Sequence, residues 1–297
     1  MNTINLKTFK SYLKTQHHKE STIKEDQQNV TRFIDWLKPE DFEEVVQLST
    51  TRLVAYINFM QSKQLAASTI NIRLRSIRKY YKFLESEGQP IVVKTDNLKV
   101  KGTTKKVVID PLTFSELEEL YKTYLNYLEN KPIVKKKQVK TNERKSILIS
   151  LLIFQGLHAG ELQKLEVNHL RLNDGTLYIP STNNGQSREL KLHPSQIITL
   201  YNFVNNLPSE QAFLFDYKVN DQIHRIFLEL RGLNEKIQNA RHIRASVIMH
   251  WLKLHGKRQT QYMIGHKWIS STEHYERQDL EALTNALDKF HPLLSDY

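Results

Sequence analysis

The sequence predicts a mainly α-helical protein in two parts, with one small antiparallel sheet in the second part. Apolar residues recur at helical spacing through the first 90 residues and again through most of the second half. The segments 176–180 and 188–192 are strand-like, and Asn183-Asn184-Gly185 between them is typical of a hairpin turn. A polar, basic stretch at 91–110 reads as a linker between the two parts.

Composition narrows the classes of function. The net charge of +11 indicates a polyanionic partner, with DNA or RNA as the first candidate. The absence of cysteine excludes disulfides, thiolate metal sites and a cysteine nucleophile, and it suits a reducing cytoplasm. The first ten residues lack the apolar core of a signal peptide, and the longest apolar run, Ile147–Phe154, is too short to span a bilayer. A cytoplasmic protein without a membrane role is expected.

The first part is expected to be helical throughout. Thr22 and Glu25 have the spacing of a capping box that opens a helix, and Pro39 should end that helix. A second helix is expected at 50–63. A third, at 68–87, carries an apolar stripe of Ile70, Leu74, Ile77, Tyr81 and Leu84. Its roughly opposite face holds four cations without an acid among them, Arg75, Arg78, Lys79 and Lys82. We expect this face to bind DNA phosphates, although a merely solvated charged face has the same pattern.

The second part should open at a capping box formed by Thr113 and Glu116. The lysine-rich segment 130–145 is expected to be an exposed loop and a candidate DNA contact. Helices are expected at 147–155, at 159–166 and from 194 onward, with a short strand at 212–215. Near the C-terminus a further apolar stripe is formed by Leu280, Leu283, Leu287 and Phe290.

Three stretches carry the chemistry. They read Gly156-Leu157-His158-Ala159-Gly160-Glu161-Leu162, then Arg241-His242-Ile243-Arg244, then Gly265-His266 followed nine residues later by Tyr275. In this order they resemble the tyrosine recombinase (integrase) family, and the resemblance covers almost the whole chain. It implies a helical, SAM-like core-binding domain at 1–90 that contacts DNA, the basic linker at 91–110, and a mixed α/β, mostly helical catalytic domain at 111–297.

In that family a tyrosine attacks a DNA phosphodiester, forms a 3′-phosphotyrosine and releases a 5′-hydroxyl, so neither metal nor ATP is needed. The resemblance assigns the nucleophile to Tyr275, a phosphate hydrogen bond to His266 and a phosphate-binding guanidinium to Arg244. It implies double-stranded DNA as the partner, no cofactor, and self-association as a tetramer on DNA, in which the C-terminal stripe would dock on a neighbour or fold onto its own domain.

Three positions depart from the family pattern. His158 stands where the first arginine is expected, and it lacks the bidentate fork and the permanent charge. A phosphate alongside would favour its protonated form. Arg241 stands where the family has a histidine, and the hairpin near Asn183 carries no lysine, although Arg188 and Lys191 lie on the following strand. We hypothesise that Arg241 partly replaces the charge missing at 158.

Two main interpretations follow. The chain is an active, metal-independent DNA strand-transfer enzyme of a mobile element, or a catalytically impaired DNA-binding accessory or regulatory protein on the same fold. A third, type IB topoisomerase activity, fits a helical N-terminal part of about 90 residues less well.

Overall fold

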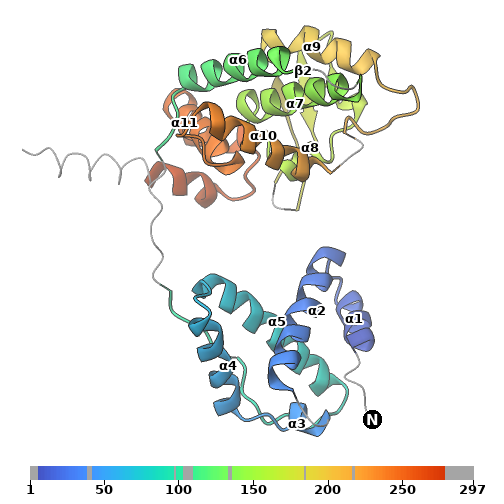
Figure 1. Cartoon of the computed structure of the whole chain (residues 1–297), viewed down its shortest axis with the longest axis vertical. Helices are drawn as coiled ribbons and strands as arrows, with labels where there is room; N and C mark the ends of the chain where they lie inside the picture. The colour runs from blue at the N-terminus through green and yellow to red at the C-terminus, as the bar shows by residue number, and fades with distance from the viewer. Residues whose placement is uncertain are drawn as a thin grey trace, which may run out of the picture. The chain divides into compact units, whose positions relative to one another are not determined.

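The computed structural model describes residues 6–38, 42–96, 98–102, 110–132, 136–183, 185–215 and 218–277. The chain divides into two compact units, Met1–Lys106 and Val107–Tyr297 (Figure 1). Each unit has its own apolar core. The C-terminal stripe from Leu280 to Phe290 lies outside the described residues. Within the described ranges, no helix has the length and apolar character that a membrane span requires.

The first unit is a helical bundle. Its helices are α1 (Leu6–Thr15), α2 (Glu20–Leu37), α3 (Phe42–Val46), α4 (Thr50–Ser62) and α5 (Ala67–Ser86). The α5 prediction is confirmed: all five residues of its apolar stripe are buried, and α5 packs against α1, α2 and α4. Helix α4 also matches its expected range. It begins at Thr50 because the Ser49 side chain accepts a hydrogen bond from the Arg52 amide and so caps the helix.

Two boundary predictions in the first unit are wrong. Helix α2 begins at Glu20, so Thr22 lies inside the helix and opens no capping box. The linker begins later than residue 91, because residues 91–96 and 98–102 lie against the bundle: Val93 is buried, and the Arg78 guanidinium donates to the carbonyls of Thr95 and Leu98. Residues 103–109 lie outside the described ranges.

The second unit is mostly helical, with one small sheet. Its helices are α6 (Phe114–Asn130), α7 (Lys136–Phe154), α8 (Ala159–Leu162), the 3-10 turn η1 (Val167–His169), α9 (Pro194–Asn205), α10 (Val219–Leu233) and α11 (Ala240–Ile264), with a last helical stretch at 269–277. The expected capping box is present, since Thr113 and Glu116 bond reciprocally at the start of α6. The backbone of α11 leaves helical geometry once, at Gly256.

Helix α7 is the centre of this unit and contacts α6, α9, α10 and α11 (Figure 1). Its apolar run from Ile147 to Ile153 is buried around the whole circumference, and the small polar residues Ser146 and Ser150 are buried with it. A helix that is apolar on every side requires neighbours on every side, and the four packing partners provide them.

The sheet has three antiparallel strands in the order β1 (Leu170–Arg171), β2 (Thr176–Ile179) and β3 (Arg188–Lys191). The predicted hairpin is confirmed, with Leu177 opposite Leu190. The two-residue strand β1 was not predicted because it is too short to show alternation. The expected strand at 212–215 is reduced to one bridge, between Glu166 and Phe213.

The lysine-rich segment 130–145 is not a loop: α7 begins at Lys136. Lys131 and Lys145 both pair with Glu229 of α10, with Nζ–Oε1 distances of 2.8 and 2.7 Å. Lys145 is buried, and its pair with Glu229 supports the packing of α7 against α10, whereas Lys131 joins the end of α6 to the same carboxylate. The expected helix at 159–166 is also shorter, because α8 ends at Leu162.

Candidate active site

A buried carboxylate joins two arginines from distant parts of the second unit. Oε1 of Glu161, on α8, lies 2.7 Å from Nη1 of Arg188, on β3. Oε2 of the same carboxylate lies 3.1 Å from Nη1 of Arg244, on α11. We call Glu161, Arg188 and Arg244 the arginine cluster. The Arg188 and Glu161 side chains are 0% and 1% exposed, whereas the Arg244 side chain is 14% exposed and forms the accessible part of the cluster.

Arg244 is oriented by the backbone as well as by Glu161. Its Nη1 donates to the Gly156 carbonyl, and its Nη2 donates to the Ile264 carbonyl at 3.0 Å. Asn239 caps the start of α11 by accepting from the Arg241 and His242 amides, which fixes the turn that carries Arg244. The guanidinium is therefore held in one place before any ligand arrives.

Arg188 is the strand residue that reaches into this region, whereas Lys191 on the same strand is exposed. Its Nε donates to the Met263 carbonyl at 2.6 Å, and its Nη2 is buried without a hydrogen-bond partner among the described residues. The position of the Arg188 side chain also explains why residue 265 is a glycine. A Cβ at position 265 would collide with Nη1 of Arg188, and the Gly265 φ of +75° already favours glycine.

The charges of the arginine cluster do not balance. Burial alone would raise the pKa of Glu161, but Arg188 and Arg244 outweigh it, so the pKa is lowered and the carboxylate is ionised at neutral pH. Two guanidinium groups then face one carboxylate, and one positive charge is left over. A buried charge without a counterion is costly, which makes the cluster complementary to an anion.

His158 has a structural task that the sequence did not reveal. Its Nδ1 accepts from the amides of Gly160 and Glu161, at 3.0 and 3.2 Å, and so caps α8. Protonation at Nδ1 would break both bonds, and burial lowers the pKa of His158. The geometry favours the neutral ring in this state, against the expectation of a conditional cation.

His266 and Tyr275 lie beside the arginine cluster. Burial, reinforced by Arg244 and Arg188, lowers the pKa of His266 to about 4. The Tyr275 ring packs nearly parallel to the His266 ring, with an interplanar angle of 13° and 6.1 Å between centroids. The Tyr275 phenol also acts electrostatically on the pKa of Arg244, so the phenol and the guanidinium are neighbours.

The hairpin is attached to the segment that carries His266. The Gln186 amide donates to the Gly265 carbonyl at 2.9 Å, and Gly185 forms an antiparallel bridge with His266. A lysine does reach the hairpin, but from the residues after α8: Lys164 Nζ donates to the Ser181 carbonyl at 3.0 Å. Residue 184 lies outside the described ranges.

Arg241 is not part of the cluster. It lies in the first turn of α11, three residues before Arg244, and is exposed. Sequence reasoning also gave no role to Glu161 or to Thr272, whose Oγ1 lies 3.0 Å from His266 Nδ1. The available signals were the capping-box spacing from His158 to Glu161 and the position of Thr272 three residues before Tyr275.

The basic face of α5 is only partly available. Lys79 pairs with the buried Asp26 at 2.6 Å, and Arg78 is engaged by the two loop carbonyls described above. The acid was missed because it comes from α2, not from α5. Arg75 and Lys82 are exposed.

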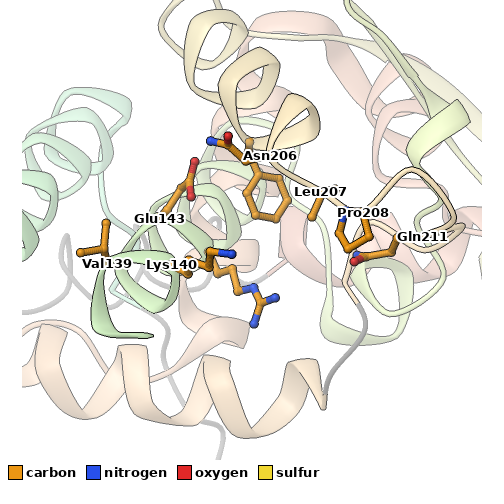
Figure 2. A pocket seen from close by; sticks show the side chains of 9 residues that line it. Val139, Lys140, Glu143, Asn206, Leu207, Pro208 and Gln211 are labelled. Atoms are coloured by element: carbon orange, nitrogen blue, oxygen red, sulfur yellow. The ribbon is translucent and has the colours of Figure 1, made fainter. Parts of the chain in front are cut away.

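Two hollows flank the end of α9 where it meets α7. Figure 2 shows the smaller one, of about 370 Å³, between Val139, Lys140 and Glu143 of α7 and Asn206–Pro208 after α9. The larger, of about 490 Å³, shares Val139 and Glu143 with it. No residue of the arginine cluster lines either hollow. Among the described residues, no group of three His, Asp or Glu side chains has the geometry of a metal site.

Sequence comparison finds DNA recombinases that are similar to this chain. Residues 6–88 match the phage integrase N-terminal SAM-like domain. The chain is 24% identical to the TnP I resolvase of Bacillus thuringiensis over 228 residues, which cover 74% of this chain and 75% of the relative. It is 23% identical to the tyrosine recombinase XerC of Oceanobacillus iheyensis, over 96% of this chain and 95% of the relative.

Solved structures show the same fold. A lambda integrase dimer bound to a COC′ core site superposes with a TM-score of 0.65, at 15% identity, over 91% of this chain and 93% of the other. The XerH recombinase bound to a palindromic difH substrate gives a TM-score of 0.63, at 17% identity, over 90% and 79%. With these matches and with Arg244, His266 and Tyr275 gathered at one place, the chain resembles tyrosine recombinases in sequence and in fold.

Proposed function

We propose that this chain is a site-specific DNA recombinase or integrase that cleaves and rejoins strands through a 3′-phosphotyrosine at Tyr275. The proposal rests on one observation: the Tyr275 phenol lies beside the arginine cluster, which is largely buried and has one positive charge in excess. Such a charge binds a phosphodiester and stabilises the extra negative charge that gathers on its oxygens during attack. A transposon integrase, that of Tn1549, is among the proteins of similar fold, and we propose a mobile element as the source of this chain.

The reaction exchanges one phosphate ester bond for another. The Tyr275 oxygen loses its proton and attacks phosphorus, while the bond from phosphorus to the 5′-oxygen breaks and that oxygen takes up a proton. Arg244 is fixed before the substrate binds, so it stabilises the transition state without reorganisation. The reverse attack by the 5′-hydroxyl of another strand restores the phosphodiester, with the energy of the ester kept in the phosphotyrosine.

A covalent adduct tests the proposal. A duplex carrying the element's end sequence is nicked just beside the scissile phosphate, so that the released short strand diffuses away and the adduct accumulates. We expect a protein–DNA species that survives denaturation. Trypsin should release the nucleotide on the peptide from Trp268 to Arg277, because Tyr275 is the only tyrosine between Lys267 and Arg277. Attachment to any other peptide would contradict the assignment.

A second function rests on one specific observation. His158 caps α8 through Nδ1, so its neutral ring can offer only the single N–H at Nε2, and one preorganised donor and the permanent charge of an arginine are missing. Loss of one such donor reduces rates by about 10²–10³-fold. If the chain binds the duplex but no adduct forms, it acts as a DNA-binding accessory or regulatory protein on the recombinase fold.

Arg241 is proposed to supply part of the missing charge from the rim of the site. Since it is exposed and shares a helix side with Arg244, it can approach a phosphate that Arg244 holds. We expect Arg241→Ala to slow adduct formation by up to about 10²-fold. Arg258→Ala, at an exposed arginine further along α11, is the matched control. An Arg241→Ala protein that forms the adduct at the parental rate would refute the idea.

Double-stranded DNA is the proposed partner of both units. Arg75 and Lys82 are the exposed members of the α5 face, and we propose that they contact backbone phosphates. Arg78 and Lys79 would support that face from their bonds to the loop and to Asp26. Assembly into a tetramer on DNA is likewise a proposal.

A further inference from the structure

Thr272 is a buried hydroxyl with one described partner. It lies in the helical stretch 269–277, is 0% exposed, and its Oγ1 is 3.0 Å from Nδ1 of His266. Thr272 and Tyr275 are three residues apart on this helix and therefore share a side of it. The hydrogen bond thus joins the helix of the tyrosine to the histidine beside the arginine cluster.

The direction of this hydrogen bond follows from what Thr272 can do with its proton. A hydroxyl both donates and accepts, and buried donors are almost always satisfied. Within the described part of the chain, His266 Nδ1 is the acceptor in reach of the Thr272 hydroxyl, which makes no bond to a carbonyl of its own helix. If Nδ1 instead carried the proton and donated, the Thr272 proton would be buried without a partner.

The tautomer of His266 follows from that direction. The imidazole is neutral at physiological pH, because burial and the two arginines lower its pKa and disfavour its charged form. A neutral ring has one N–H, so an Nδ1 that accepts from Thr272 leaves the proton on Nε2. No protein partner of Nε2 is found among the described residues.

We propose that Thr272 is a positioning residue that fixes His266 in the Nε2-protonated tautomer, so that a neutral imidazole presents a donor to the scissile phosphate. The target of that donor rests on the function proposed above, whereas the tautomer does not. Without Thr272, the His266 ring could adopt the other neutral tautomer. Nε2 would then carry a lone pair, which repels a phosphoryl oxygen.

Nitrogen NMR on the full chain tests the tautomer without any DNA. The protein is labelled with ¹⁵N-histidine, and a His266→Gln variant identifies the signals of this ring among the 12 histidines. We expect Nε2 to show the shift of a protonated ring nitrogen and Nδ1 that of an unprotonated one. Thr272→Ser should keep this pattern, and Thr272→Val should give a mixture of both tautomers.

Activity provides the second readout. Thr272→Val should form the adduct about three- to tenfold more slowly, the factor that one ordinary hydrogen bond supplies, with unchanged affinity for the duplex. Thr272→Ser should retain the parental rate.

A parent protein with the proton on Nδ1, or a Thr272→Val protein with an unaltered tautomer, overturns the proposal. If Thr272→Val does not fold, the parent and Thr272→Ser spectra still decide. The expected tautomer in a protein that forms no adduct supports this assignment and refutes the proposed reaction instead.

Discussion

Replacing Tyr275 with Phe should abolish the covalent adduct and leave duplex binding unchanged. The substitution removes the attacking oxygen and keeps the ring, which is half-buried against the core of the second unit and packs beside His266. No hydrogen bond to the phenol oxygen is found among the described residues, so its removal should change the free energy of unfolding by less than about 0.5 kcal/mol. Denaturing gels measure the adduct, and gel shift at fixed salt measures binding.

Tyr262→Phe is the matched control. Tyr262 lies on α11, is exposed, and accepts only a long bond of 3.3 Å from the Glu189 amide. We expect it to form the adduct at the parental rate. Persistence of the adduct in Tyr275→Phe would mean that another side chain is the nucleophile, and the proposed reaction would then be wrong.

Local patterns made much of the fold predictable. The α5 stripe repeats at helical spacing, so its burial follows from the sequence alone. The hairpin was readable because two alternating segments flank a turn sequence. The start of α7 could not be predicted, because its lysines have the pattern of a solvated segment. The partner of Lys145 is Glu229 of α10, which is 84 residues away in the chain. Likewise, the packing of residues 91–96 and 98–102 depends on contacts with α5 and not on their own pattern.

The same distinction applies to the site. Spacing within one motif indicated that Tyr275 and His266 are neighbours, and the rings do pack together. The arginine cluster joins Glu161 to Arg188, 27 positions later, and to Arg244, 83 positions later, and the capping-box spacing before Glu161 does not distinguish this hub from an ordinary helix residue. His158 shows the reverse case. Its position suggested phosphate chemistry, while its actual bonds are those of a cap.

Glu161→Gln should strongly destabilise the second unit. The change keeps the shape of the side chain but leaves Arg188 and Arg244 without a counterion in a region where Arg188 is fully buried. Removing one partner of a buried ion pair typically lowers the free energy of unfolding by about 3–5 kcal/mol. Urea unfolding should be followed in a Trp36→Phe background, where the two remaining tryptophans, Trp251 and Trp268, both report on the second unit.

The pH dependence separates the charge of Glu161 from its shape. The folded-state pKa of Glu161 is lowered, so its contribution to stability is fully present above the unfolded value of about 4.3 and is lost as the pH falls through the folded value. The stability difference between parent and Glu161→Gln should therefore be constant near neutrality and shrink below pH ~4. Glu189→Gln, which removes an exposed pair with Arg171, should change stability by less than about 1 kcal/mol. Equal effects at positions 161 and 189 would contradict a buried, charge-bearing hub, and the excess positive charge inferred for the site would lose its structural basis.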